Sequence, residues 1–260
     1  MATQPIKKRT DHQIACGKAQ SELKIWRFEI VLGAIPGYPC LISKPRTGSI
    51  MSLRIVAISD THGNHWALDV PDGDILLHAG DMTVKGSIED VKDFDTFLGQ
   101  LPHPVKIAIA GNHDFCFERD PEGSAAVLTN AIYLQDQSVA IEGIRFYGSP
   151  WQPWFHDWAF NLRRGFEIRA KWELIPEGTD VLITHGPPYG HGDRTYRGEL
   201  VGCRDLLEVA DRILPRFHIF GHIHEGVGVT ANEHTTFINA CSCNHHFEPV
   251  NEPIVFEIEL

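Results

Sequence analysis

Five short blocks of the sequence carry aspartate, asparagine and histidine at close spacing, and these residue types bind divalent cations. The blocks are Asp60-Thr61-His62-Gly63, Gly80-Asp81, Gly111-Asn112-His113-Asp114, His185-Gly186 and Gly221-His222-Ile223-His224. Carboxylate, amide oxygen and imidazole together suit Mn, Fe, Zn, Ni or Mg rather than copper(I) or an iron–sulfur cluster. We therefore predict a centre for two divalent cations, whose ligands are Asp60, His62, Asp81, Asn112, His185, His222 and His224.

The spacing within two of the blocks suggests how their side chains would share the cations. Asp60 and His62 are two residues apart, so an extended backbone would aim both side chains at one cation. His222 and His224 repeat this spacing and could straddle two cations if the chain bends between them.

The other blocks supply oxygen ligands of two kinds. Asp81 has two carboxylate oxygens and is the natural bridge between the cations, whereas Asn112 adds a neutral oxygen that limits the total negative charge. Any one block alone is more often a capped turn or a surface pair. All five in this order have no such structural explanation.

The elements that must position these blocks are short apolar runs of strand length. Each block directly follows one of them, at residues 53–59, 75–79, 105–110, 181–184 and 217–220. Runs that are apolar throughout predict strands buried on both faces. Open α/β sheets place their binding residues at the carboxyl ends of such strands.

Helices and hairpins are predicted between these runs. Ser87 is a helix cap, with helical apolar spacing through Gln100, and residues 205–214 repeat that spacing. Hairpins are expected over 138–147 and 227–239. Together these elements predict an α/β sandwich of two mixed β-sheets flanked by helices.

Composition excludes several classes of function. The net charge of −11 is opposite to the basic surface that grips long nucleic acid. The sequence contains no stretch of about 18 uncharged apolar residues, so it predicts no membrane span. The six cysteines show no metal-finger spacing, and without a visible secretory signal we expect reduced thiols and a cytoplasmic protein. We assign residues 51–260 to the domain and regard residues 1–50 as an N-terminal extension or a start-site artefact.

The blocks together resemble those of the calcineurin-like metallophosphoesterases. The resemblance covers about residues 53–260, and two longer strings, residues 147–155 and 175–180, resemble the metallophosphoesterase-domain-containing (MPPED) subgroup. It implies that Asp60, His62, Asp81 and His224 hold one cation and that Asp81, Asn112, His185 and His222 hold the other. It also implies that His113, with Asn112, faces the substrate phosphate.

Two departures from related families narrow the expectation. After Gly80-Asp81 the chain continues Met82-Thr83-Val84-Lys85, without the Asp-Arg-Gly triplet of the protein Ser/Thr phosphatases, so the aspartate that orients their catalytic histidine is missing. Val84 also stands where purple acid phosphatases require a tyrosine, which argues against an Fe(III)–Tyr centre.

The expected reaction is hydrolysis of small phosphodiesters by a hydroxide on the two cations, with His113 as general acid. The MPPED resemblance suggests cyclic nucleotides such as 2′,3′-cyclic AMP as substrates. From the ligand types we expect Mn²⁺ as the cation, with Fe, Zn, Ni or Mg as alternatives. A phosphomonoesterase or pyrophosphatase on the same site, and a nucleotide-binding scaffold with little turnover, remain open. The expected partner is therefore a small phosphoester or nucleotide, and the sequence does not indicate the oligomeric state.

Overall fold

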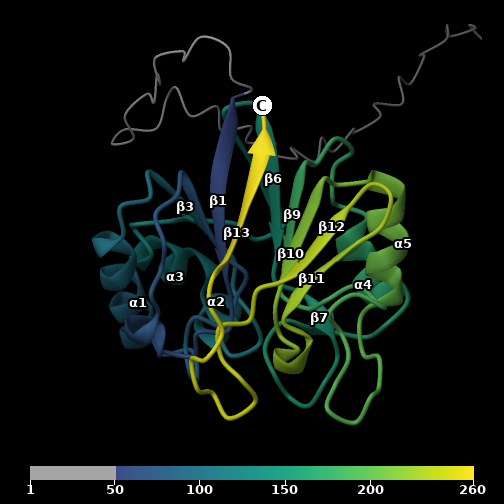
Figure 1. Cartoon of the computed structure of the whole chain (residues 1–260). Helices are drawn as coiled ribbons and strands as arrows, with labels where there is room; N and C mark the ends of the chain where they lie inside the picture. Colours follow the sequence, from purple (N-terminus) through teal and green to yellow (C-terminus); the bar gives the residue numbers. More distant parts are fainter. Residues whose placement is uncertain (1–50) are drawn as a thin grey trace, which may run out of the picture.

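Two β-sheets packed face to face form the centre of the molecule in this computed structural model, which describes residues 51–260 (Figure 1). The expectation for residues 1–50 lies outside the described part. One sheet has the order β13 (Ile254–Glu259), β1 (Ser52–Ile58), β2 (Ile75–His78), β3 (Val105–Ala108) and β4 (Ile132–Tyr133). The other has the order β11 (Gly228–Ala231), β12 (Thr236–Asn239), β10 (Phe217–Phe220), β9 (Val181–Thr184), β6 (Ile144–Ser149) and β5 (Gln137–Ile141).

Both sheets are mixed, as predicted. The pairs β1–β13, β5–β6 and β11–β12 are antiparallel, and the remaining neighbours within these two sheets are parallel. A short parallel ribbon of β7 (Gln152–Pro153) and β8 (Asn161–Leu162) lies apart from them.

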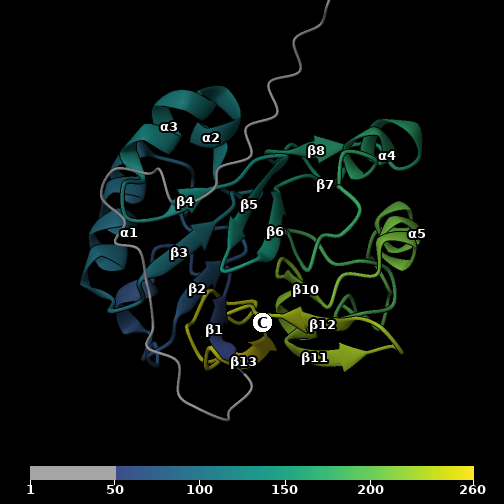
Figure 2. The ribbon, with the colours of Figure 1, turned by 90° about the horizontal axis from the view of Figure 1, so that it is seen from above.

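Helices cover the outer face of each sheet (Figures 1 and 2). The five-stranded sheet is covered by α1 (Ile88–Gln100), α2 (Phe115–Arg119) and α3 (Pro121–Val127), and the six-stranded sheet by α4 (Phe166–Trp172) and α5 (Arg204–Ile213). Two single-turn 3₁₀ helices, η2 (His65–Ala67) and η3 (His224–Gly226), lie in loops. No helix in residues 51–260 is long and apolar enough to cross a membrane.

The strand β1 shows why its sequence is apolar on both faces. Ile55 and Ala57 pack into the core between the two sheets, whereas Val56 and Ile58 pack against residues of α1 on the outer face. All four side chains are fully buried. The prediction of strands buried on both sides is therefore confirmed.

Most predicted elements are present with small shifts at their ends. The five apolar runs form β1, β2, β3, β9 and β10, and both hairpins form as β5–β6 and β11–β12. The Ser87 hydroxyl caps α1 by accepting the Asp90 backbone N–H at 3.1 Å. The sequence analysis missed α2, α3, α4 and the strands β4, β7, β8 and β13, most of which are short.

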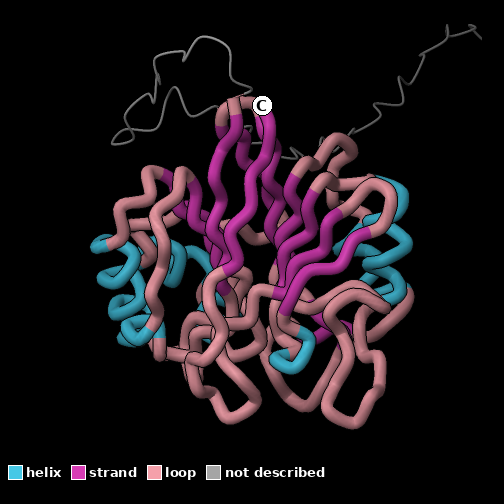
Figure 3. The backbone as a smooth tube through the Cα atoms, viewed as in Figure 1, coloured by secondary structure: helices cyan, strands magenta, loops and turns pink. Residues whose placement is uncertain are grey.

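The carboxyl ends of the parallel strands from both sheets meet at one edge of the sandwich, where long loops gather (Figure 3). The sheets are also tied together at this edge. Ser59, directly after β1, pairs with Cys241, and its carbonyl accepts the Ser242 N–H at 2.8 Å. Loops of both sheets can therefore build one site.

Candidate metal centre

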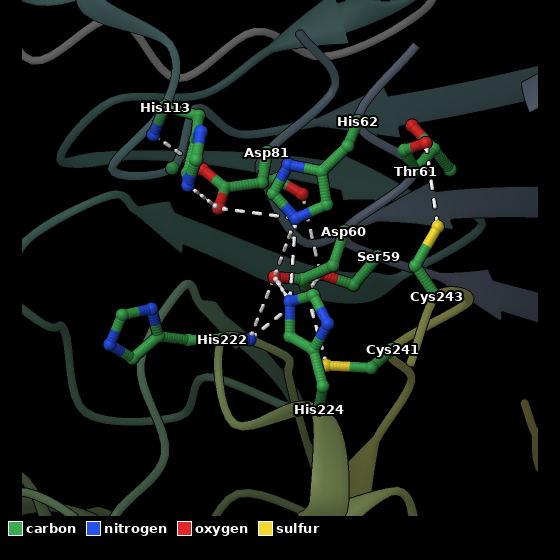
Figure 4. Close-up of polar contacts among 12 residues, drawn as sticks. Ser59, Asp60, Thr61, His62, Asp81, His113, His222, His224, Cys241 and Cys243 are labelled. Atoms are coloured by element: carbon green, nitrogen blue, oxygen red, sulfur yellow. Dashed lines mark hydrogen bonds and ion pairs between the residues drawn. The ribbon is translucent and has the colours of Figure 1, made fainter. Parts of the chain in front are cut away.

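All eight predicted side chains come together at this edge of the sandwich. Figure 4 labels six of them, namely Asp60, His62, Asp81, His113, His222 and His224. They come from the loops that follow β1, β2, β3, β9 and β10. These loops are linked through the backbone, since the Asp60 N–H donates to Gly80 O at 2.9 Å and the His62 N–H donates to Asp81 O at 3.0 Å. Segments far apart in the sequence therefore converge, as predicted.

The backbone that achieves this convergence differs from the expected one. We predicted an extended Asp60-x-His62 segment, but φ is 52° at Asp60 and 44° at His62. The extended expectation is wrong because β1 ends at Ile58 and the chain turns at once. Asp81 and His222 also have positive φ, at 58° and 67°, so the second histidine block bends, as its straddling alternative required.

One group of ligand atoms surrounds His62. Its Nε2 lies 3.3 Å from His224 Nε2, 3.9 Å from Asp60 Oδ1 and 3.8 Å from Asp81 Oδ2. Two ligands that each lie about 2.1 Å from a cation are about 3.0–3.4 Å apart at octahedral or tetrahedral angles. Small movements of these four side chains would therefore enclose one ion.

A second group surrounds His185. Its Nε2 lies 2.8 Å from Asn112 Oδ1 and 3.5 Å from Asp81 Oδ2, and its ring lies 5.0 Å from that of His222 between centroids. Asp81 Oδ2 thus lies within 4 Å of a histidine nitrogen in each group, as a bridging carboxylate would.

Two of the imidazoles are oriented so that they could bind a cation. Nδ1–H of His185 donates to Ala79 O at 3.0 Å, and Nδ1–H of His224 donates to Asn244 O at 2.7 Å. When either ring is neutral, it presents a lone pair at Nε2, the usual arrangement of a metal-binding histidine. Nε2 of His62 lies 3.3 Å from Nε2 of His224, so either a proton or a cation must lie between these two atoms.

The buried carboxylates and histidines of the centre shift one another's pKa values. Burial disfavours the imidazolium of His185, but the Asp81 carboxylate outweighs it and raises the pKa of His185 to about 9. Burial also disfavours the charged form of His224, but the Asp60 carboxylate outweighs this effect and raises the pKa of His224 to about 9. Although burial acts to raise the pKa of Asp60 and Asp81, the surrounding histidines hold the pKa of both carboxyls below its ordinary value. Protons and cations would therefore compete for the same nitrogen atoms.

The remaining two histidines of the set are neutral. Burial is the main cause that lowers the pKa of His62 to about 4 and the pKa of His222 to about 3. A neutral imidazole offers the lone pair that a cation needs, so these rings need no deprotonation to bind one near neutral pH.

His113 has a different environment and faces a cleft. Its Nδ1–H donates to Val84 O at 2.8 Å, and its backbone N–H donates to Asp81 Oδ1 at 2.7 Å. Trp158 packs over its ring with 4.2 Å between centroids. Nε2 is left pointing to the centre, 4.0 Å from Asp81 Oδ2. The Val84 carbonyl therefore orients His113 in place of the aspartate that protein Ser/Thr phosphatases use. Because this carbonyl belongs to the backbone, no residue type in the sequence could have indicated its role.

Asp114 is a further residue that the sequence analysis left without a role. Its carboxylate is fully buried and accepts the N–H of Gly111 at 2.8 Å, of Asp81 at 2.9 Å and of Thr83 at 2.9 Å. These hydrogen bonds link the loop after β2 to the loop after β3. Its place in the third block, next to His113, was the signal that could have found it.

A cleft of about 210 Å³ opens over the centre. The residues that line it include Asp81, Asn112 and His113 together with the aromatic residues Phe155, Trp158 and Phe247. A larger hollow of about 420 Å³ is lined by Trp154, Arg163 and Arg164 and by none of the ligand residues, so the chemistry belongs to the smaller cleft.

The fold and this constellation define a class of phosphoesterase, and comparison with known proteins agrees. The model of the calcineurin-like phosphoesterase family matches residues 53–226, and the chain belongs to this family. Members of the family bind divalent metals and act as phosphoric ester hydrolases.

Individual relatives narrow this class. The chain is 46% identical over 230 residues to human metallophosphoesterase domain-containing protein 1, covering 79% of this chain and 71% of that protein. It is 42% identical over 237 residues to UPF0046 protein T07D4.2 of Caenorhabditis elegans, covering 79% of this chain and 60% of that protein. The crystal structure of TT1561 of Thermus thermophilus superposes with a TM-score of 0.50 at 16% identity, covering 73% of this chain and 89% of that one, and it supports the fold alone.

Proposed function

We propose that this chain is a phosphodiesterase that needs two divalent cations, with Mn²⁺ as the resident ion. Its substrates would be small phosphodiesters, namely nucleotides and cyclic nucleotides such as 2′,3′-cyclic AMP. The observation that carries the proposal is the position of Asp81 Oδ2, which lies 3.8 Å from His62 Nε2, 3.5 Å from His185 Nε2 and 4.0 Å from His113 Nε2. One carboxylate oxygen thus adjoins both ligand groups and the proposed acid.

The ligand assignment follows the two groups. Asp60, His62, Asp81 and His224 would hold one cation, and Asp81, Asn112, His185 and His222 the other. When bound, such a pair lowers the pKa of a shared water toward neutrality and draws charge from the phosphoryl oxygens.

The residues of the cleft would complete the reaction. Water would attack phosphorus in line with the leaving oxygen and release one proton to solvent, so that one P–O bond forms while the opposite one breaks. His113 holds Nδ1–H on Val84 O, so only its imidazolium form can carry a second proton at Nε2. That proton passes to the leaving oxygen. Asn112 turns its amide oxygen to His185, which leaves its NH₂ group to donate to a phosphoryl oxygen.

The aromatic residues of the cleft support a nucleotide as the substrate class. Phe155 and Phe247 are about half exposed, at 55% and 47%, and both line the cleft. An apolar aromatic surface beside phosphate-binding residues suits a ligand with a flat base. Trp158 also lines the cleft, but its ring is occupied with His113.

A substrate panel with metal-replete protein tests this function. We expect turnover of bis-p-nitrophenyl phosphate and 2′,3′-cyclic AMP well above that of p-nitrophenyl phosphate and pyrophosphate. Asp81→Asn should lose turnover of both diesters, and His113→Ala should lose turnover of 2′,3′-cyclic AMP. Preferential turnover of p-nitrophenyl phosphate or of pyrophosphate would replace the phosphodiesterase by a phosphomonoesterase or a pyrophosphatase. Nucleotide binding without turnover under Mn²⁺ would indicate a scaffold.

A further inference from the structure

The two oxygens of the Asp60 carboxylate have different surroundings (Figure 4). Oδ1 faces the centre, 3.5 Å from His224 Nε2 and 3.9 Å from His62 Nε2. Oδ2 accepts three hydrogen bonds, from the Ser59 hydroxyl at 2.5 Å, the His222 N–H at 2.9 Å and the Cys241 thiol at 3.2 Å. The His222 N–H also lies 3.1 Å from Oδ1, so the two side-chain donors are the contacts specific to Oδ2.

The thiol contact is enclosed and geometrically fixed. Cys241 is 1% exposed and Asp60 fully buried, so water does not compete for the bond. Cys241 follows β12 of the six-stranded sheet, pairs with Ser59 across the junction of the two sheets, and has its N–H held by Asn239 Oδ1 at 3.1 Å. Because Asp60 is ionised and accepts only, the thiol must be the donor.

Such donors decide how a carboxylate meets a cation. A hydrogen bond to an ionised group is among the stronger ones in proteins, and three on one oxygen hold the carboxylate plane in place. With Oδ2 occupied, Oδ1 alone is available to a cation. Groups that orient ligands in this way commonly change metal affinity about 10–100-fold when removed.

We propose that Cys241 is a positioning residue of the metal centre: with Ser59 it holds Asp60 so that only Oδ1 binds the cation shared with His62 and His224. The proposal rests on the metal centre of the proposed function and not on its choice of substrate.

A competing role for Cys241 is direct ligation. One atom each of Asp60, His224 and Cys241 lies within 4.8 Å of the other two, so a thiolate ligand is the alternative that the test must separate. The geometry favours the donor role, because the sulfur contacts Oδ2, the oxygen that also accepts the Ser59 hydroxyl.

Calorimetric titration of metal-free protein with Mn²⁺ tests the proposal without any substrate. We expect Cys241→Ala to weaken one of the two binding events about tenfold, and Cys241→Ser, which keeps an O–H donor, to stay within about threefold of the wild type. The matched control is Cys243→Ala. Cys243 is an equally buried thiol two residues away, but it contacts Thr61 O at 3.6 Å instead of Asp60, and its removal should leave both events unchanged. Equal affinity in Cys241→Ala and wild type would overturn the proposal.

Spectroscopy of the Co²⁺-loaded protein separates donor from ligand. We expect no thiolate-to-cobalt charge-transfer band in the near ultraviolet. A band that disappears in Cys241→Ser but persists in Cys243→Ala would make Cys241 a ligand and refute the positioning role.

A folding defect can be recognised and bypassed. Circular dichroism and thermal unfolding of each metal-free variant show whether it folds. If Cys241→Ala does not, Ser59→Ala removes the other side-chain donor to Oδ2 and should weaken the same binding event, whereas an unchanged affinity there would count against the proposal. Because these measurements use only metal, they stand even if the substrate panel rejects a phosphodiesterase.

Discussion

At the scale of single residues, backbone carbonyls decide what each imidazole at the centre can do. Three backbone carbonyls each accept a hydrogen bond from the Nδ1–H of one histidine: Val84 from His113, Ala79 from His185 and Asn244 from His224. The Nε2 atom of each ring therefore points toward the centre. Of these three, His185 and His224 adjoin carboxylates within 3.5 Å, whereas His113 lies 4.0 Å from Asp81 and lines the cleft. In the proposed function, position alone therefore divides equivalent side chains between metal binding and proton transfer.

Replacing His113 should affect reactions according to their leaving group. We expect His113→Ala to lower kcat about 10²–10⁴-fold for a ribose alkoxide leaving group, because a general acid contributes about that much. The loss should be much smaller for p-nitrophenolate, which departs without a proton. Steady-state kinetics with 2′,3′-cyclic AMP and bis-p-nitrophenyl phosphate measures this. Equal losses on both substrates would mean that His113 acts by some means other than protonation.

At the scale of elements, the ligands converge because the loops after the strands are tight and pass close to one another. A side chain at Gly111 would collide with Asp81 Oδ1 and lie 2.6 Å from His185 Cε1. At Gly186, beside His185 on another loop, an added Cβ would meet only Gln152 Cβ at 3.5 Å, an ordinary contact. The close approach at Gly111 is therefore a requirement of the centre, whereas that at Gly186 is not.

This difference predicts opposite effects of the same substitution. Gly111→Ala should displace the bridging Asp81 and weaken Mn²⁺ binding more than about tenfold while the helix and strand content stays intact. Gly186→Ala should bind Mn²⁺ like the wild type. Metal titration and circular dichroism of both variants provide the comparison, and normal binding by Gly111→Ala would show that the loop can yield without disturbing the ligands.

At the scale of the whole molecule, the centre joins the two halves of the sandwich. The five-stranded sheet contributes Asp60, His62 and Asp81, and the six-stranded sheet contributes His185 and His224. Cations bound between them should stabilise the folded state, because the unfolded chain does not assemble the site.

Metal removal should therefore lower thermal stability. At a Mn²⁺ concentration of about 100 times Kd, binding contributes about 2.7 kcal/mol, which is a shift of about 5–10 °C in Tm for a domain of this size. Scanning calorimetry with a chelator and then with added Mn²⁺ measures it, and Asp81→Asn should show little response. An identical Tm in chelator and Mn²⁺ would contradict a shared interfacial centre.

Buried histidines away from the cleft should make the fold sensitive to acid. His218 in β10 is fully buried, its Nε2–H donates to Thr184 Oγ1 at 2.9 Å, and its Nδ1 has no partner. Burial, together with nearby His191, lowers the pKa of His218 from 6.5 to about 3. Between these values the unfolded chain binds a proton that the folded one does not, so stability falls as pH drops below about 6.5.

A substitution isolates this contribution. We expect His218→Gln, which keeps a donor for Thr184, to lose about 1.4 kcal/mol less stability than the wild type between about pH 7.5 and pH 5.5. Urea unfolding at both pH values measures the difference. The same acid sensitivity in both proteins would assign it to other buried groups.

The sequence by itself determined the main strands and which candidate ligand residues lie at their ends. Apolar runs of strand length, such as those of β1 and β9, predict strands buried on both faces, and the carboxyl ends of parallel strands meet at one edge of a sheet. The ligand types at those ends followed from cation chemistry. Short elements such as β7 and α2 were missed because they contain too few residues to show a period.

Only the tertiary structure decided how the ligands are held. The Val84 carbonyl that orients His113 is a backbone group, which every residue has, so its role depends on where the loop places it. Cys241 lies 181 residues from Asp60 along the chain, and no spacing rule connects them. Contacts of this kind arise when the two sheets pack against each other. Which residues then meet depends on the three-dimensional packing and cannot be read from their order in the sequence.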